Sequence, residues 1–193
     1  MSLDSKYLGL EEMKSLGFKS IGTNVKISRS AKIYHPDRIE IGSNVRIDDF
    51  CLLSPGKDGL RLGNYVHISA FCGMVGKGRI ELDDFVGLSS RVYLYSSSDD
   101  YSGLSLTNPT VPNEFTDVES DPIRIGKHVI LGTCATVLPG VKIGSSSAIG
   151  AYSLVNNDVP EGVIAVGQPC VEIRKRDLKH LELEKQLSRR KDA

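Results

Sequence analysis

Four histidines are the side chains of this 193-residue chain best suited to move protons: His35, His67, His128 and His180. An imidazole titrates near neutral pH and can serve as a general base. Three converging histidines could instead bind zinc. His35, His67 and His128 fall at different phases of the six-residue repeat of this chain, so no zinc trio is expected. His180 lies in a charged C-terminal segment, and His35 precedes Pro36 in an early turn.

A second group of candidates lies in residues 96–122, a polar stretch of 27 residues with three prolines. Loops this long in compact domains are usually functional or disordered, and the aromatic Tyr101 and Phe115 argue against disorder. The adjacent acids Asp99 and Asp100 could orient an imidazole or act as the base themselves. Adjacent acids in loops also commonly form turns, so both interpretations stay open.

Composition narrows the class of protein. The formal net charge is zero, with 24 basic and 24 acidic residues, which gives no electrostatic reason to expect nucleic acid as a partner. No apolar run approaches the roughly 18 residues of a membrane span, and no signal peptide is visible. Cys51, Cys72, Cys134 and Cys170 show no CxxC spacing, which favours reduced cysteines, some of them in the core, and a cytoplasmic protein.

The elements that must position these residues follow from a six-residue repeat. An aliphatic residue followed by Gly, a small residue or an acid recurs every six positions, most clearly in residues 131–154. Such a hexapeptide repeat predicts a β-solenoid. Three hexapeptides make one triangular coil of 18 residues, and coils stack about 4.8 Å apart. The aliphatic residue points into the prism, while Gly tolerates the bends at its corners.

The repeat divides a single domain, residues 1–193, into segments. Coils are predicted over 21–95 and 123–167, separated by the extended loop 96–122. Residues 57–61 and 76–78 are expected to be turn insertions at corners. The two ends need caps: a helix is expected over 5–17, and an amphipathic helix over 171–190, where leucines alternate with dense charge.

The repeat, the loop between coils and the ending Ala-Val-Gly-Gln-Pro-Cys at 165–170 together resemble a known family. They are similar to the left-handed β-helix acyltransferases. Within these, the closest subgroup is the sugar acetyltransferases: galactoside and maltose O-acetyltransferases and the acetyltransferases of surface-polysaccharide synthesis. The resemblance implies an all-β fold, a single-stranded left-handed parallel β-helix with a short N-terminal helix and a C-terminal helix.

The same resemblance implies an acetyl-CoA-dependent enzyme without a metal, working as a homotrimer with each active site between two prisms. The pantetheine arm of CoA would run along the coils, lined by the backbone of Gly132, Thr133, Gly150 and Ala151. The CoA phosphates would be bound by cations; the candidates are Lys142, Arg174, Lys175 and Arg176. The last three could equally form a solvated helix face.

The resemblance also implies a general base, which in the galactoside subgroup is a histidine of the loop. This loop has no histidine, which leaves His67 as the first candidate and His128 as the second. Tyr101, Asn108 and Glu114 offer hydrogen bonds suited to a sugar or nucleotide-linked sugar acceptor. Acylation of oxygen or nitrogen, and a donor other than acetyl-CoA, stay open. A catalytically inactive scaffold is the alternative function.

Overall fold

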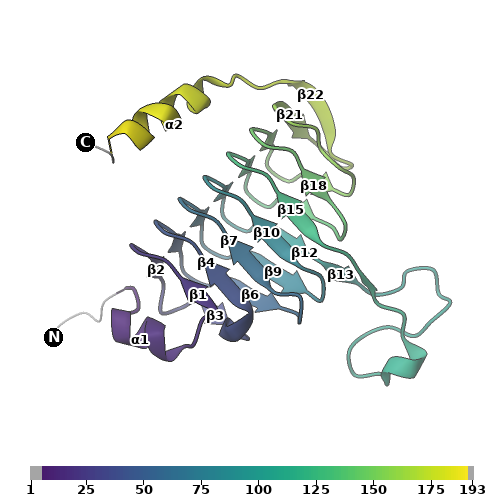
Figure 1. Ribbon diagram of the computed structural model, residues 1–193. Coiled ribbons are helices and arrows are strands. Elements are labelled where there is room, and N and C mark those ends of the chain that lie inside the picture. The colour runs from purple at the N-terminus through teal and green to yellow at the C-terminus, as the bar shows by residue number, and fades with distance from the viewer. Residues whose placement is uncertain (1–5, 191–193) are drawn as a thin grey trace.

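The computed structural model describes residues 6–190, which wind into a parallel β-helix with a helix near each end (Figure 1). Short strands from successive coils pair in parallel and form three sheets that run the length of the molecule. The expected fold class is therefore confirmed. Within residues 6–190, no helix is long and apolar enough to cross a membrane.

Each sheet takes one strand from each coil, and sheet 2 ends with one additional strand that pairs antiparallel. Sheet 1 contains β1 (Ser20–Ile21), β4 (Ile39–Ile41), β7 (Leu60–Leu62), β10 (Ile80–Leu82), β15 (Ile123–Ile125) and β18 (Lys142–Ile143). Sheet 2 contains β2 (Lys26–Ile27), β5 (Arg46–Ile47), β8 (His67–Ile68), β11 (Gly87–Leu88), β16 (Ile130–Leu131), β19 (Ala148–Ile149), β21 (Val163–Val166) and β22 (Val171–Lys175). Sheet 3 contains β3 (Lys32–Ile33), β6 (Leu52–Pro55), β9 (Gly73–Gly76), β12 (Tyr93–Tyr95), β17 (Thr136–Val137) and β20 (Leu154–Val155).

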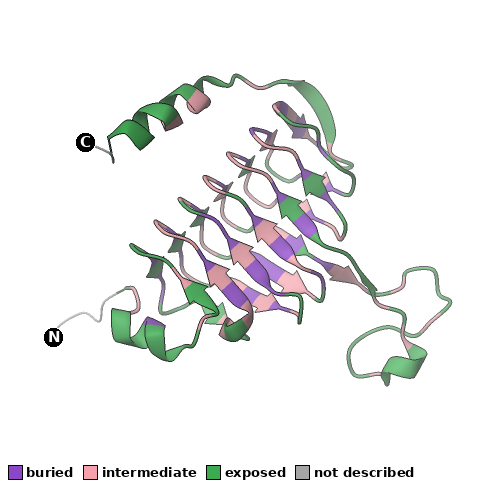
Figure 2. Cartoon of the chain, viewed as in Figure 1, coloured by how far each residue is buried: buried purple, intermediate pink, exposed green. Residues whose placement is uncertain are grey.

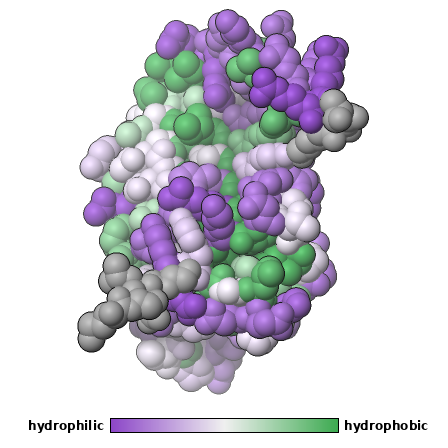
Figure 3. All heavy atoms as spheres, turned by 90° about the vertical axis from the view of Figure 1, so that its left-hand side faces the viewer, coloured by the Kyte–Doolittle hydropathy of each residue, from purple (hydrophilic) through white to green (hydrophobic). Residues whose placement is uncertain are grey.

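The hydrophobic core is the interior of the prism. The aliphatic residue of each hexapeptide points inward, as Ile47, Ile68 and Leu88 do in sheet 2, and these side chains are at most 1% exposed. Figure 2 shows the resulting alternation of buried and more exposed positions along the strands. Seen from the left-hand side of Figure 1, hydrophobic side chains gather in patches between hydrophilic ones (Figure 3).

Coil length differs between the two halves of the helix. In the late coils the register advances by 18 residues, as in the pairing of Arg124 with Lys142. In the early coils it advances by 20 or 21, as in Ile39 with Leu60 and Leu60 with Ile80. The extra residues lie between sheets 3 and 1, which confirms the expected insertions at that corner. The insertion between β3 and β4 forms the short helix η1 (Pro36–Arg38).

The prism has three corners. Corner A joins sheet 1 to sheet 2, corner B joins sheet 2 to sheet 3, and corner C joins sheet 3 back to sheet 1. Corner B comprises residues 28–31, 48–51, 69–72, 89–92, 132–135 and 150–153. One residue in most corner A and corner B turns has a left-handed φ, between 53° and 64°. Side chains at these equivalent positions therefore stack on one another along the molecule.

The long loop leaves corner C after β12 and projects away from the prism, on the opposite side from the C-terminal helix (Figure 1). Its two ends form a small antiparallel pair, β13 (Ser97–Ser98) with β14 (Glu119–Ser120). Between them lies one short helix, η2 (Asn113–Phe115). The loop is thus an ordered excursion from the prism, anchored by its own two-stranded base.

Both terminal caps are shorter than expected. The N-terminal helix α1 covers Leu10–Ser15; residue 5 of the expected helix lies outside the described residues. The C-terminal helix α2 covers Lys179–Arg189. The helix expected from residue 171 was wrong for its first part, because residues 171–175 form β22, which pairs antiparallel with β21. Pairing with the exposed edge of the last coil outweighs the helical pattern there.

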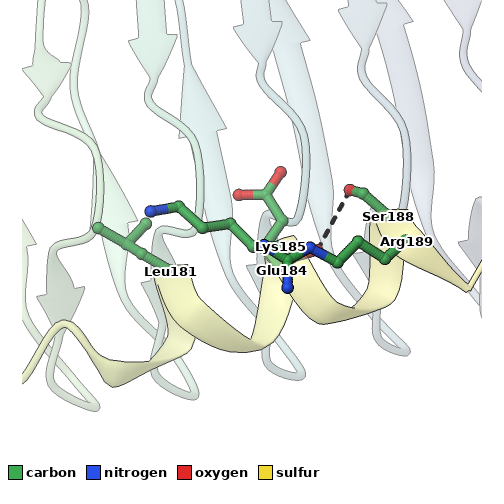
Figure 4. A pocket seen from close by; sticks show the side chains of 5 residues that line it. All are labelled: Leu181, Glu184, Lys185, Ser188 and Arg189. Atoms are coloured by element: carbon green, nitrogen blue, oxygen red, sulfur yellow. Dashed lines mark hydrogen bonds between the residues drawn. The ribbon is translucent and has the colours of Figure 1, made fainter.

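Helix α2 lies across the outside of corner A (Figure 4). Glu184 reaches from the helix to Lys127 at 2.6 Å and to Nε2 of His128 at 2.8 Å. Nε2 of His180 lies 3.0 Å from the Ser146 hydroxyl. No residue of α2 is fully buried, so these polar contacts carry much of the docking of the helix.

Candidate active site

Corner B carries a column of small residues in the last three of its turns. Its first positions are Ser89, Gly132 and Gly150, and its second positions are Ser90, Thr133 and Ala151. The turns stack through backbone bonds such as Tyr152 N to Thr133 O at 2.8 Å. A Cβ on Gly132 would lie 2.5 Å from the backbone nitrogen of Ala151. The backbones of successive coils are therefore tightly packed in the column, and the side chains on its outer surface are small. A pantetheine arm lying along the column would require such a surface.

The structure brings together the four expected groove residues, which were Gly132, Thr133, Gly150 and Ala151, at this one corner. The expected phosphate-binding cations lie in different parts of the prism. Arg174 and Lys175 belong to β22, at the end of sheet 2, and Lys175 pairs with Glu172 at 3.0 Å. Lys142 instead starts β18 in sheet 1, away from corner B.

Arg176 is a structural residue. Its Nη1 donates hydrogen bonds to the carbonyl oxygens of His128 and Ser147, both at 2.9 Å. Burial lowers the pKa of this guanidinium. These bonds attach the segment between β22 and α2 to corner A. Arg176 is therefore neither on a solvated helix face nor beside the small-residue column.

His67 lies at the start of β8 on the outer surface of sheet 2, beside corner B. Its Nε2 is 2.9 Å from Oδ2 of Asp48, the first corner residue of the preceding coil. Asp48 is 7% exposed and also accepts a bond from Nε of Arg46 at 2.7 Å. Burial opposes ionisation of Asp48, but the bonds from Arg46 and His67 outweigh burial and lower its pKa. An ionised Asp48 thus accepts Nε2–H and leaves Nδ1 of His67 free to accept a proton.

The other three histidines lie elsewhere. His128 is at corner A, stacked on Phe85 with ring centroids 4.8 Å apart, and its imidazole is engaged by Glu184. His35 is at corner C, and His180 is in α2. His35, His67 and His128 therefore occupy three different parts of the prism, and residues 6–190 contain no group of three metal-ligating side chains in reach of one ion.

The loop holds an acidic cleft lined by Ser98, Asp99, Asp100, Tyr101, Asp117 and Glu119. Two of its acids differ in their bonding. Asp100 accepts hydrogen bonds from the backbone nitrogens of Ser102 and Ser105 and from the Ser105 hydroxyl, and these bonds hold its pKa well below the usual range. Asp99 is exposed and makes no side-chain hydrogen bond within the described residues. Asp100 thus shapes the loop, whereas Asp99 is available to a substrate.

The expected acceptor-binding residues are only partly assembled. Tyr101 shares the acidic cleft and is 93% exposed. Glu114 lines a second cleft of the loop with Leu104, Leu106 and Phe115. Asn108 lines neither of these two clefts; its Oδ1 accepts bonds from N and Oγ1 of Thr110, so it holds a turn.

Sequence reasoning missed Asp48 and Ser89 as members of the site. Asp48 precedes His67 by almost one early coil, and pairing of Ile47 with Ile68 places it alongside. That signal was available once the early coils were known to exceed 18 residues. Ser89 could have been found because it continues the column of Gly132 and Gly150 by one coil, although the loop interrupts the repeat between them.

The arrangement combines a backbone-lined column, a histidine oriented by a carboxylate, and an acidic loop that leaves from a different corner. A parallel β-helix built on hexapeptides with these parts defines a hexapeptide-repeat acyltransferase. No family model matches the sequence. The chain is 46% identical over 178 residues to a dTDP-4-amino-4,6-dideoxy-D-glucose acyltransferase of Escherichia coli, covering 92% of this chain and 93% of the relative.

Two further comparisons agree. A putative lipopolysaccharide biosynthesis O-acetyl transferase, WbbJ of Escherichia coli K12, is 32% identical over 120 residues, covering 61% of this chain and 58% of the relative. The structure of AntD, an N-acyltransferase from Bacillus cereus, in complex with dTDP and 3-hydroxybutyryl-CoA, has a TM-score of 0.94 and 40% identity, and covers 98% of this chain and 100% of that one. This chain belongs to the hexapeptide-repeat sugar acyltransferases, and the family resemblance of its sequence is confirmed.

Proposed function

We propose that this enzyme transfers an acyl group from a CoA thioester to the amino group of a nucleotide-linked amino sugar, for surface-polysaccharide synthesis. One observation carries the proposal: the match to the Escherichia coli dTDP-amino-sugar acyltransferase extends over 92% of this chain. The AntD complex with dTDP and an acyl-CoA supports the same pair of substrates. The WbbJ relative supports the pathway.

In this proposal the pantetheine arm lies on the small-residue column of corner B. Gly132, Thr133, Gly150 and Ala151 supply close backbone approach. Arg174 and Lys175 lie in the half of β22 nearer corner A, opposite Ile164 and Val163, so they would reach the CoA phosphates across the last strand of sheet 2. Lys142 lies in another sheet and could act only on a donor bound by a neighbouring copy. The thioester then lies at the near end of the column, close to Ser89.

His67 acts as the general base. The sugar nitrogen attacks the thioester carbonyl and gives a proton to Nδ1 of His67, which forms the tetrahedral intermediate. When the intermediate collapses, the carbon–sulfur bond breaks and the CoA thiolate takes that proton from the imidazolium. Asp48 holds the ring through Nε2 and stabilises the imidazolium. A backbone N–H of the corner would stabilise the oxyanion of the tetrahedral intermediate.

Asp99 is proposed to bind the attacking amino group from the loop. Solved variants of AntD replace a serine and an aspartate that lie ten positions apart. Ser89 and Asp99 have the same separation in this chain, as do Ser90 and Asp100. The engagement of Asp100 within the loop favours the first pair. Ser89 at the end of the column and Asp99 in the acidic cleft would then face one another across the reacting atoms.

The proposed assembly is a homotrimer. The loop leaves the prism at corner C, not at corner B, and points away from the prism (Figure 1). In the trimer, the loop of one copy would therefore contact corner B of the next copy. The loop's exposed hydrophobic residues support this packing: Leu104 is 93% exposed, Leu106 58% and Phe115 57%. The four free cysteines and the two soluble substrates support a cytoplasmic location.

The test is acyl transfer measured by mass spectrometry. Acetyl-CoA and 3-hydroxybutyryl-CoA are each offered with dTDP-4-amino-4,6-dideoxyglucose and, as control acceptor, the matched sugar nucleotide carrying a hydroxyl at carbon 4. The proposal predicts an amide product from the amine alone. Ester formation on the hydroxyl sugar would overturn the choice of nitrogen, and CoA binding without transfer to any acceptor would favour the inactive scaffold.

A further inference from the structure

Two phenylalanines and an arginine form a stack on the outside of corner B. The rings of Phe50 and Phe71 lie with centroids 5.0 Å apart and planes 22° apart. Cζ of Arg91 lies 5.1 Å from the centroid of Phe71. The three residues occupy the same left-handed position in consecutive coils, with φ of 59°, 64° and 62°. The backbone of the corner therefore holds the stack in place.

The stack is open to solvent. Phe50 is 58% exposed and Phe71 43%, and Arg91 is also exposed. Within residues 6–190 the guanidinium of Arg91 makes no hydrogen bond and no ion pair. Its planar fork can therefore offer parallel N–H donors to two oxygens of one anion. Contact with the aromatic ring restricts the side chain in advance, which lowers the entropy lost on binding.

Arg91 stands between the two halves of the proposed site. It follows Ser89 and Ser90 in the turn where the small-residue column begins. Its backbone nitrogen bonds to the carbonyl oxygen of Ala70, in the turn that follows His67, at 3.1 Å. An anion bound by Arg91 would thus lie on the same two neighbouring coils as the base and the donor end.

The acids of this corner do not oppose an anion. Asp48 is neutralised by Arg46, at 2.7 Å, and faces His67. Asp49 accepts a bond from Ser28 and pairs with Lys6 at 3.3 Å. With both carboxylates paired, the charge of Arg91 remains available to a ligand.

Both proposed substrates contain a diphosphate, and their shapes distinguish them. In CoA the diphosphate is separated from the thioester by the whole pantetheine arm, so it would lie beyond the far end of the column. In a nucleotide-linked sugar the diphosphate is attached directly to the sugar ring. Only the second would be near Arg91 when the sugar amine is near His67.

We infer that Arg91, held in place by Phe71 and Phe50, binds the diphosphate of the nucleotide-linked sugar and so places the acceptor amine beside the thioester. The inference rests on the proposed function. It assigns acceptor binding to a residue at the left-handed position of a corner turn.

The experiment measures binding of dTDP and, separately, of CoA by isothermal titration calorimetry, for the full-length wild type and Arg91→Gln. Loss of charge-assisted bonds predicts a Kd for dTDP that is at least about tenfold higher in Arg91→Gln. The Kd for CoA should stay within about twofold, since its diphosphate lies elsewhere. Phe71→Leu, which removes the ring but keeps the charge, should weaken dTDP binding less. The matched control is Arg61→Gln, which removes an exposed cation of sheet 1 that pairs with Asp83 and should leave both constants unchanged.

Three results would overturn the inference. Unchanged dTDP binding in Arg91→Gln, in a wild type that acylates the amino sugar, would remove Arg91 from the site while the proposed function stands. A rise in the Kd for CoA alone would assign the guanidinium to the donor. A wild type that neither binds dTDP nor acylates an amino sugar would overturn the proposed function and this inference with it.

Discussion

The ring of His67 is held by one carboxylate, and that carboxylate is itself held by Arg46. This chain of bonds sets which nitrogen is free, because ionised Asp48 accepts the hydrogen bond from Nε2–H and leaves Nδ1 without the proton. The loop contributes two neighbouring acids with opposite roles, since Asp100 is consumed by hydrogen bonds to Ser102 and Ser105 and Asp99 is not. At this scale, the proposed chemistry depends on His67 and Asp99, each supported by a neighbour that does not react.

Replacement of His67 by Ala is expected to lower kcat by about 100-fold or more, as removal of a general base does. Asp48→Asn should lower kcat less, because Nε2 would lose its ionised partner and the ring would be held less firmly. The measurement is the rate of thiol release from acyl-CoA by the wild type and both variants. His67→Ala with wild-type turnover would remove this residue from the reaction.

Asp99→Asn is expected to lower kcat/KM for the amino sugar by about 100-fold, with the fold of the loop intact. Asp100→Asn is the structural comparison: it should lose loop bonds and loosen the segment, which limited proteolysis would report. If Asp100→Asn abolished turnover while Asp99→Asn did not, the serine and aspartate pair would instead be Ser90 and Asp100.

At the scale of the elements, the corner B column has room only for small residues, because each coil stacks directly on the next. Gly132→Ala places a Cβ 2.5 Å from the backbone nitrogen of Ala151 and 2.8 Å from the backbone carbon of Gly150. Backbone atoms cannot move aside cheaply, so the change should cost about 1–3 kcal/mol of stability and weaken acyl-CoA binding. The matched control is Gly87→Ala in β11, whose Cβ would meet only Ile130, at 3.9 Å. Equal thermal midpoints for the two variants would contradict this account of the column.

The docking of α2 should depend on pH. Burial, helped by the nearby charges of Arg176 and His128, lowers the pKa of His180 in the folded state. The unfolded chain then binds a proton more readily, so the contribution of His180 is fully present above about pH 6.5 and is lost as the pH falls below it. Thermal unfolding from about pH 8 to about pH 5.5 should show a steeper loss in wild type than in His180→Gln. Parallel curves would show that this histidine does not sense pH.

Most of the elements could be predicted from the sequence, but only part of the candidate site could. Hexapeptide phase predicts the coils because each inward aliphatic residue repeats a local rule, and it placed Gly132 and Gly150 at one corner. It could not place β22, since strand pairing with β21 is a tertiary contact that overrides the helical pattern of residues 171–175. It also missed Asp48, because the partner of His67 depends on how many residues each corner C turn adds.

At the scale of the whole molecule, the proposed site requires more than one copy of the chain. The base and the column lie at corner B, and the loop carrying Asp99 leaves from corner C and projects outward (Figure 1). A homotrimer joins them if each loop reaches the corner B of the next copy. Sedimentation or light scattering should then report three copies, and replacing residues 101–117 by a short Gly-Ser linker should remove activity while the β-helix stays folded. A monomer with full activity would contradict the shared site.

The most direct measurement mixes two inactive variants. His67→Ala and Asp99→Asn are each purified, then dissociated together and reassembled, and thiol release is assayed with the amino sugar nucleotide. If one copy supplies His67 and the next supplies Asp99, random mixing regenerates both residues at roughly a quarter of the sites of a closed ring, and activity returns to about that fraction. If the mixture stays as inactive as its parents, His67 and Asp99 do not act from neighbouring copies, and the proposed shared site is wrong.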